Sequence, residues 1–236
     1  MEREGCVPPA LSIIVPVLDD AAALEALAPD LTAFRSRGAE VIVVDGGSSD
    51  GSIAAAEGCA NLVLNAPRGR ASQMNAGARR AQGETLLFLH ADTLLPPEAD
   101  RLIARALAGS TPGWGRFDIR IESTSPLLAA VALAMNLRSR LTGVATGDQA
   151  IFAHRRLFDA LGGYPEIALM EDVAFSKAAK HISRPICLTE RVTTSARRWQ
   201  KNGVVRTIAL MWYLRLAYFL GADTKALARR YGYAAS

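Results

Sequence analysis

Residues 84–93 read ETLLFLHADT, an apolar run that passes directly into a polar segment. The run at 86–89 is too short for a buried helix and is typical of a buried β-strand. It ends at His90-Ala91-Asp92, so a carboxylate follows the carboxyl end of the strand. Ligands bind at that edge in open α/β sheets. Asp92 is therefore a candidate site residue, although an acid in this position can also be a loop residue or a helix cap.

Two earlier apolar runs end in the same way. Residues 11–17 are followed by Asp19 and Asp20, and Asp45 closes the run at 40–45. Parallel strands present their carboxyl ends at one edge of a sheet. We therefore expect the acids after the three strands to line a single polar crevice.

Helical segments separate these strands. Apolar residues recur at helical spacing over 24–34. A second helix is predicted from Ser49 or Asp50 to about residue 57, followed by a strand at 62–64 and a helix at 71–82. This alternation predicts an α/β fold with a mostly parallel, doubly wound sheet. The less regular second half predicts helices at 96–108, 126–141, 155–161, 171–181 and 202–231, with a break near Gly221, and strands at 114–121, 149–153 and 186–188.

Composition limits the class of protein. Half of the 236 residues are hydrophobic and 21% are charged, which predicts a globular core. The net charge is only +4, and no basic arm or aromatic-interleaved basic surface is present, so nucleic acid is not an expected partner. Three widely spaced cysteines predict neither a disulfide framework nor a zinc site, and residues 1–9 lack an apolar core, so no signal peptide is expected. These features favour a cytoplasmic location.

Two apolar stretches bear on membrane contact. Residues 123–137 are uncharged, but these 15 residues fall short of the roughly 20 that a spanning helix needs. Residues 204–222 are interrupted by Arg206 and Arg215. Neither stretch is predicted to span a membrane. The second stretch favours a helix packed on the core, and an amphipathic helix on a membrane surface is the alternative.

The expected crevice has the chemistry of a nucleotide site without a glycine-rich loop. Neither Gly-x-Gly-x-x-Gly after the first strand nor a Walker motif is present. The acids after the first two strands suit hydrogen bonds to a base or a ribose. Arg68 and Arg70, on either side of Gly69, can bind a diphosphate. Asp92 can hold Mg²⁺ or Mn²⁺ between the two phosphates.

Seven motifs resemble those of glycosyltransferase family 2 and stand in the family's order. They are SIIVPV (12–17), VVDGGSSDGS (43–52), RASQMNAG (70–77), LHADT (89–93), GDQAIF (147–152), LGGYP (161–165) and MEDV (170–173). The chain is most similar to a compact bacterial subgroup, some members of which are named for arsenosugar biosynthesis. The resemblance implies a GT-A domain over residues 11–200, and we expect residues 201–236 to form a helical extension packed on it.

The resemblance implies an inverting, hexosyltransferase-type enzyme that moves a sugar from a nucleotide-diphospho-sugar to a hydroxyl acceptor. By position it assigns nucleotide-sugar binding to Pro16, Asp19, Asp45, Arg68, Arg70, His90, Ala91 and Arg198, and the metal to Asp92. His90 stands where the family's Asp-x-Asp signature has its first acid, so the metal would have a single carboxylate. We expect the His90 ring to bond to the backbone or the ribose.

Glu171 and Asp172 match the family's acidic pair near the acceptor. Direct displacement with inversion needs one base for the acceptor hydroxyl. We assign this role to Asp172, with Glu171 as the second choice. Both acids could instead only stabilise a helix N-terminus.

The acceptor side is assigned to Gly147, Asp148, Gln149 and Trp199. The pair Arg198-Trp199 resembles part of the Gln-x-x-Arg-Trp motif of processive members, but Ser195 replaces the glutamine, so polymer synthesis is not predicted. The Trp199 ring could stack on a sugar or anchor the C-terminal helix.

Two other functions fit parts of the pattern. A nucleotidyltransferase has a similar sheet, but it normally carries a glycine-rich loop with Arg and Lys after the first strand. A degenerate, non-catalytic fold that serves as a membrane-associated scaffold is suggested by the missing acid at His90. The acceptor, either a small molecule or a lipid-linked one, stays open, as does a peripheral location at the inner face of the membrane.

Overall fold

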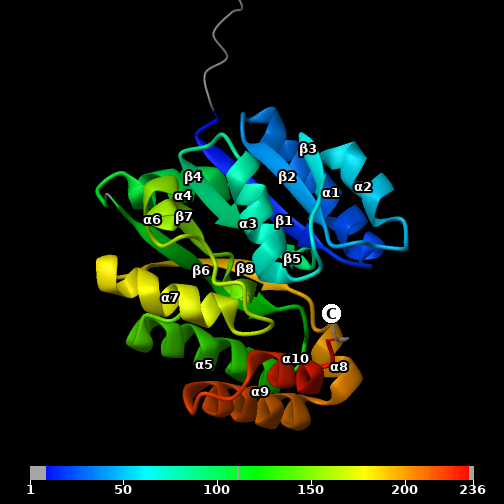
Figure 1. Ribbon diagram of the computed structural model, residues 1–236, viewed down its shortest axis with the longest axis vertical. Coiled ribbons are helices and arrows are strands. Elements are labelled where there is room, and N and C mark those ends of the chain that lie inside the picture. The colour runs from blue at the N-terminus through cyan, green and yellow to red at the C-terminus, as the bar shows by residue number, and fades with distance from the viewer. Residues whose placement is uncertain (1–8, 111, 234–236) are drawn as a thin grey trace, which may run out of the picture.

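The computed structural model describes residues 9–110 and 112–233, so Cys6 and most of the segment without signal-peptide features lie outside it. Eight strands form one sheet in the order β3-β2-β1-β4-β7-β6-β8-β5 (Figure 1). The strands are β1 (Leu11–Val17), β2 (Glu40–Asp45), β3 (Leu62–Asn65), β4 (Thr85–Phe88), β5 (Thr93–Leu94), β6 (Trp114–Ile121), β7 (Phe152–His154) and β8 (Ile186–Thr194).

The strands β3, β2, β1 and β4 pair in parallel, which confirms the predicted α/β fold. Every residue of β1 and β2 is buried, as expected where helices cover both faces of a parallel sheet. Val17 lies opposite Asp45, and Asp45 lies opposite Asn65. The carboxyl ends of these strands therefore meet at one edge.

Helices cover both faces of the sheet (Figure 1). They are α1 (Ala21–Ser36), α2 (Ser52–Cys59), α3 (Arg70–Arg80), α4 (Ala99–Leu107), α5 (Pro126–Thr142), α6 (Arg155–Ala160), α7 (Glu171–Ile182), α8 (Arg197–Asn202), α9 (Val204–Phe219) and α10 (Thr224–Tyr231), with a 3₁₀ turn η1 (Gly147–Gln149). Alternate residues of each strand point to opposite faces. Accordingly, Ile13 packs in a core with α1, α2, α4 and α5, and Ile14 packs in a second core with α3, α6 and α7.

One strand was not predicted, and two others differ from their predicted bounds. The strand β5 has only two residues, too few for a pattern to show. The strand β8 continues through the exposed residues 189–191, where the apolar pattern stops, because it pairs with β6 as far as Thr194. The strand predicted at 149–153 begins only at Phe152, since Gln149 lies in η1 and Ala150 has a positive φ of 47°.

The C-terminal helices α9 and α10 pack on each other and on the segment before α7. Leu214 of α9, Leu227 of α10 and Met170 are buried in one cluster. The break predicted near Gly221 is present, with a φ of +83° at that glycine. Among residues 9–110 and 112–233, no helix has both the length and the apolar character needed to cross a bilayer.

Candidate active site

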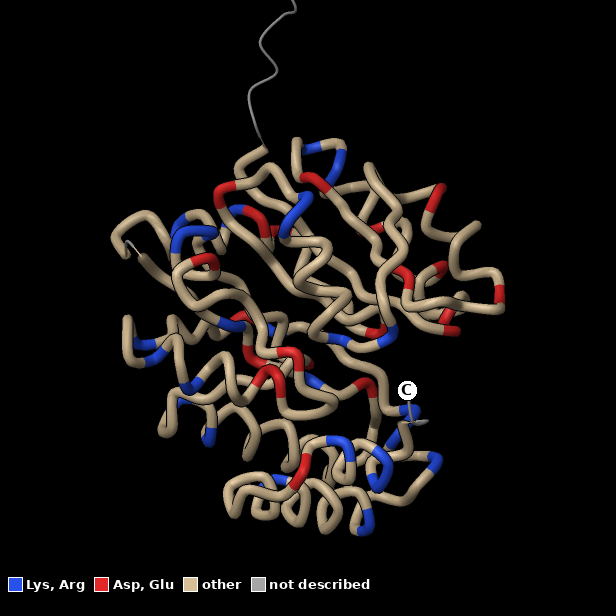
Figure 2. The backbone as a smooth tube through the Cα atoms, in the orientation of Figure 1, with Lys and Arg blue, Asp and Glu red and all other residues tan. Residues whose placement is uncertain are grey.

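A cavity of about 490 Å³ lies where the carboxyl ends of β1 and β4 meet α3, the start of α7, and α10. Figure 2 shows acidic positions gathered in this middle region, between the upper part of the molecule and the C-terminal helices. The charged and aromatic lining residues are Asp20, Arg68, Arg70, His90, Asp92, Glu166, Glu171, Lys225, Arg229 and Tyr233. Segments distant in sequence therefore converge on one space.

The structure brings only part of the predicted set to this cavity. Of the predicted residues, Pro16, Arg68, Arg70, His90, Ala91, Asp92 and Glu171 line it. The other predicted residues, Asp19, Asp45, Gly147, Asp148, Gln149, Asp172, Arg198 and Trp199, lie outside its lining.

The strand-end acids Asp19 and Asp45 shape the loop after β2. The buried Asp45 carboxylate accepts hydrogen bonds from the backbone N–H groups of Gly47 and Ser48, at 2.8 and 3.0 Å. Asp19, with a φ of 48°, accepts from the Ser49 N–H at 2.7 Å. In the structure these carboxylates hold a loop beside the cavity and do not line the cavity itself.

Asp92 follows the carboxyl end of β4 and lines the cavity, and its side chain is 36% exposed. Arg197 forms a bidentate pair with Asp20, with both contacts at 2.8 Å, and its Nη2 lies 3.8 Å from Asp92 Oδ2. Within the described chain, no group of three or more His, Cys, Asp or Glu side chains is arranged to hold a metal ion. Asp92 and Asp20 both line the cavity, and Asp20 is engaged by Arg197.

His90 is buried against Asp148 and Gly147. Its Nδ1 lies 3.3 Å from Asp148 Oδ1, a different partner from the backbone or ribose that we expected. A Cβ on Gly147 would lie 2.5 Å from His90 Cε1 and Nε2, so only glycine fits there. Burial acts to raise the pKa of Asp148, but its contact with His90 and the charges of Arg70 and Arg198 outweigh burial and hold that pKa below its ordinary value.

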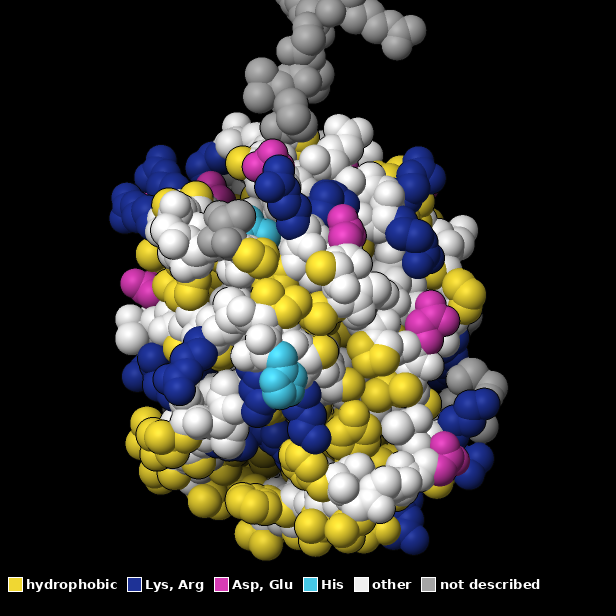
Figure 3. Space-filling view, turned by 60° about the vertical axis from the view of Figure 1, so that its left-hand side comes forward, with side chains coloured by type: hydrophobic (Ala, Val, Ile, Leu, Met, Phe, Trp, Pro, Cys, Tyr) yellow, Lys and Arg dark blue, Asp and Glu magenta, His cyan; other side chains and the backbone are white. Residues whose placement is uncertain are grey.

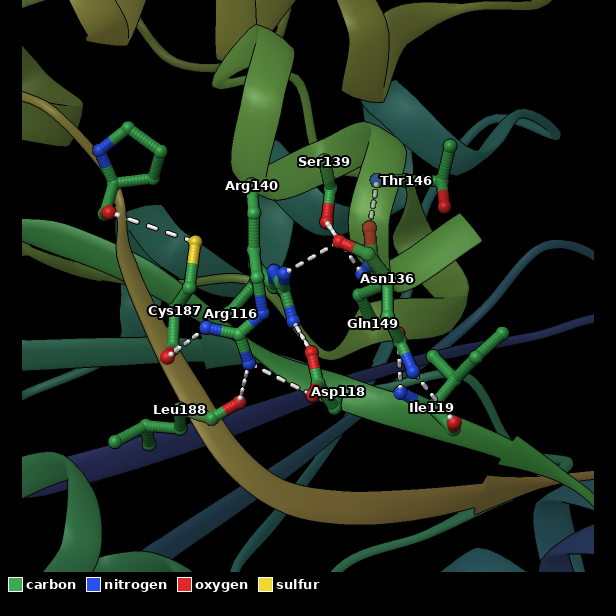
Figure 4. Close-up of polar contacts among 11 residues, drawn as sticks. Arg116, Asp118, Ile119, Asn136, Ser139, Arg140, Thr146, Gln149, Cys187 and Leu188 are labelled. Carbon is green, nitrogen blue, oxygen red and sulfur yellow. Dashed lines mark hydrogen bonds and ion pairs between the residues drawn. The ribbon is translucent and has the colours of Figure 1, made fainter. Parts of the chain in front are cut away.

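The turn η1, which carries Gly147, is anchored by a buried polar network (Figure 4). Gln149 is fully buried, and its Nε2 donates to Ser139 Oγ of α5 at 3.1 Å. Asn136, one turn earlier on α5, donates to the Ile119 carbonyl and accepts from the Ile119 N–H. The Gln149 side chain was predicted to face the sugar acceptor, but in the structure it bonds to α5 and fixes the turn η1 there.

Glu171 and Asp172 open α7 after Met170, which has an unusual positive φ of 72°. Glu171 is 5% exposed and lines the cavity. Burial, followed by the charge of Asp172, raises the pKa of Glu171 to about 7. Asp172 Oδ2 accepts from the Gly147 N–H at 2.8 Å, and Oδ1 accepts from the Val173 N–H at 2.7 Å. Burial also raises the pKa of Asp172, against both of these hydrogen bonds.

The C-terminal segment contributes cavity residues that the sequence analysis missed: Lys225, Ala228 and Arg229 of α10, and Tyr233 just after it. Lys225 and Arg229 are four residues apart and so share one face of α10, but no sequence signal places that face on the cavity. The Arg70 guanidinium lies over the Tyr233 ring at 5.6 Å from its centroid.

Arg198 and Trp199, the two residues predicted from α8, hold the C-terminal segment. The Arg198 guanidinium stacks on the Tyr231 ring at 3.7 Å and donates to the Tyr231 carbonyl. Trp199 is half-buried against the sheet core. The anchoring role considered for Trp199 fits this packing.

Comparison with known proteins supports a family assignment. The family described as glycosyl transferase family 2 matches residues 12–119. An undecaprenyl-phosphate 4-deoxy-4-formamido-L-arabinose transferase of Aeromonas hydrophila is 36% identical over 111 residues, which cover 42% of this chain and 34% of that protein. An uncharacterized glycosyltransferase of Mycobacterium tuberculosis is 30% identical over 191 residues, 76% of this chain and 72% of that protein.

Solved structures share the fold. A Pyrobaculum calidifontis mannosyltransferase in complex with GDP-Man and Mn²⁺ has a TM-score of 0.62 at 24% identity, over 97% of this chain and 66% of that one. S. aureus TarS in complex with UDP-GlcNAc has a TM-score of 0.62 at 20% identity, over 78% of this chain but only 58% of that one. These structures show the same fold. The family match, together with the mycobacterial relative that aligns along most of both sequences, shows that the chain is a glycosyltransferase and belongs to glycosyl transferase family 2.

Proposed function

We propose that the chain transfers a sugar from a nucleotide-diphospho-sugar to a hydroxyl acceptor, with inversion at the anomeric carbon. One observation carries the proposal. The same cavity of about 490 Å³ is lined by two cations, Arg68 and Arg70, by the carboxylate of Asp92 and by the buried acid Glu171. A diphosphate and a proton-accepting group can therefore meet in one space.

The donor's diphosphate would bind to Arg68 and Arg70, whose planar guanidinium groups suit phosphate oxygens. Pro16 and Ala91 would form the adjoining walls, and His90 would hold the sugar side. The loop that Asp19 and Asp45 support would lie next to the nucleoside, so these two acids would act by positioning that loop. Arg198 would reach the diphosphate only by leaving Tyr231.

A divalent cation, Mg²⁺ or Mn²⁺, would bind at Asp92. Hard cations of this kind take oxygen ligands, and Asp92 is the remaining acid of the Asp-x-Asp signature, at the cavity. Such a cation supplies charge neutralisation of the diphosphate. Mn²⁺ in the Pyrobaculum calidifontis complex supports the idea. On the protein side, Arg197 at 3.8 Å would keep Asp92 oriented toward the cavity.

The Glu171–Asp172 pair would supply the general base. The family resemblance favours Asp172, whose carboxylate is held in one orientation by the N–H groups of Gly147 and Val173. The geometry also supports Glu171, because this side chain lines the cavity and, among the described residues, accepts no hydrogen bond from another side chain. A base whose pKa lies near 7 is well matched to neutral pH. The two assignments are separated by single substitutions, given in the Discussion.

The acceptor would approach from the side of η1 and α10. Gly147 and Asp148 contact His90, which lines the cavity on this side. Gln149 would act by holding the turn η1 in place, and Trp199 by holding α8 in place. The undecaprenyl-phosphate named for the Aeromonas relative supports a lipid-linked acceptor. A small soluble acceptor is the alternative, and it would suit the resemblance to a subgroup in which some members are named for arsenosugar biosynthesis. A cytoplasmic location would suit either acceptor.

The test begins with a panel of nucleotide-diphospho-sugars, scored by thermal stabilisation with and without Mn²⁺. A ligand at a hundredfold its Kd stabilises the folded state by about 2.7 kcal/mol, which is easily measured. The stabilising donor is then incubated with candidate acceptors, and the released nucleotide is identified. We expect a nucleoside diphosphate. Release of pyrophosphate would instead indicate a nucleotidyltransferase, and a panel with no stabilising donor would indicate a non-catalytic scaffold.

A further inference from the structure

Exposed apolar side chains concentrate at one end of the molecule. Of the 13 large hydrophobic residues exposed in the described chain, ten lie on α5, on α9 or at Leu220, directly after α9. The six that define what we call the α5/α9 face are Leu133, Leu137 and Leu141 of α5, with Trp212, Leu216 and Leu220; their exposures range from 54% to 78%. In Figure 3 hydrophobic side chains cover the lower end of the molecule, where Figure 1 places α5 and α9. Apolar patches of this kind mark interaction surfaces.

The charges on these helices have one sign. Helices α5, α8 and α9 contain no Asp or Glu, and the exposed Lys201 of α8 and Arg206 of α9 form a cationic border where the two helices meet. Two lysines of α7 extend the cationic border. Lys177 Nζ lies 4.0 Å from the centre of the Phe219 ring of α9, and Lys180 Nζ donates to the Thr142 carbonyl at the end of α5. An ordinary solvated helix surface mixes charges of both signs, so this border is complementary to an anionic partner.

We infer that the α5/α9 face docks on the surface of an anionic phospholipid bilayer. Apolar side chains would enter the boundary between headgroups and acyl chains, and the surrounding cations would contact the lipid phosphates. Trp212 and Tyr213 are of the aromatic types enriched at that depth, and Trp212 is 74% exposed. The inference goes beyond the transfer reaction and adds α5, which the sequence analysis considered only as a spanning segment.

A second copy of the chain fits this face less well. Symmetric pairing through the α5/α9 face would bring two acid-free, cationic borders together, and like charges at an interface are repulsive. A bilayer containing anionic lipid meets both the apolar and the cationic parts of the face. Docking would also leave the cavity close to the headgroups, because α10 lines the cavity and packs against α9.

The test is flotation of the full chain with vesicles, without donor or acceptor, so its outcome does not depend on the transferase proposal. One set of vesicles contains equal parts of phosphatidylglycerol and phosphatidylcholine, and the other contains phosphatidylcholine alone. We expect the protein to float with the anionic vesicles, with weaker binding at high salt and to the neutral vesicles. The double variant Trp212→Gln/Leu216→Gln, at two exposed positions, should lose at least tenfold in partitioning.

The matched control is Ile53→Gln on α2, an exposed apolar position far from this face, which should leave partitioning unchanged. Exchanging the exposed cations in Lys201→Gln/Arg206→Gln should weaken binding several-fold to anionic vesicles only. Thermal melting confirms that each variant is folded, and light scattering gives its mass. Absence of flotation, or equal flotation of the Trp212/Leu216 variant, would overturn the inference. So would a dimer that this variant dissociates, because the occupant would then be a second copy.

Discussion

Replacing Glu171 with glutamine removes the charge of a nearly fully buried acid without changing its size. Burial and the neighbouring charge of Asp172 raise the pKa of Glu171 from 4.5 to about 7. A shift of this size corresponds to about 3 kcal/mol, at about 1.4 kcal/mol per pKa unit. The attraction between Glu171 and Arg70, which acts to lower this pKa, is already included in the net shift.

The sign of the effect depends on pH. Between about pH 4.5 and 7 the folded protein keeps a proton on Glu171 that the unfolded chain has lost, so the stability of the wild type falls as pH rises through this range. Glutamine does not titrate. The Glu171→Gln variant should therefore match the wild type near pH 4.5 and exceed its free energy of unfolding by up to about 3 kcal/mol at pH 8.

Urea unfolding at several pH values measures this difference, with Glu166→Gln as the control, because Glu166 borders the same cavity but is exposed. A constant difference between variant and wild type at every pH would refute the reasoning. A Glu171→Gln variant that is less stable than the wild type at pH 8 would refute it as well.

Three further comparisons, each between a pair of substitutions, test separate parts of the structure. Asp172→Asn should lower kcat by about 10²–10⁴-fold, while calorimetry shows donor binding largely intact. If Asp172→Asn instead retains most of its turnover and Glu171→Gln lowers kcat by this amount, Glu171 is the base. Gly147→Ala places a Cβ 2.5 Å from the His90 ring, so the melting temperature and the turnover should both fall. The control is Gly58→Ala in α2, where a Cβ meets nothing within 4 Å, and it should stabilise the fold by about 0.5–1 kcal/mol. Within the described chain the three buried guanidinium nitrogens of Arg138 have no hydrogen-bond partner, so Arg138→Met should unfold at an equal or higher urea concentration. Arg116→Met, which breaks the buried pair with Asp118, should cost about 3 kcal/mol, and a similar loss in both variants would contradict this distinction.

The sequence predicts the elements whose pattern is local. The strands β1 and β2 have the bounds that were predicted, because each is a continuous apolar run that ends at an acid. The extension of β8 beyond Leu188 was not predicted, because those residues are polar and gain their strand conformation from pairing with β6. A pattern within one segment does not report a distant partner.

The same limit applies to the site. The sequence places acids at the right edge of the sheet, but it does not show that Asp20 lines the cavity while Asp19, at a positive φ, turns to the loop. The raised pKa of Glu171 depends on burial in the folded chain. The contribution of Tyr233 depends on how α10 packs on α9. These features arise from tertiary packing, so the spacing of residues alone cannot reveal them.

A crystal structure of the chain with its stabilising nucleotide-diphospho-sugar and Mn²⁺ is the most direct test of the central claim that this cavity is the donor site. We predict the diphosphate between Arg68, Arg70 and Asp92, with the sugar directed toward Glu171 and Asp172. Density for the nucleotide outside this cavity, or a diphosphate that contacts none of these side chains, would contradict the claim.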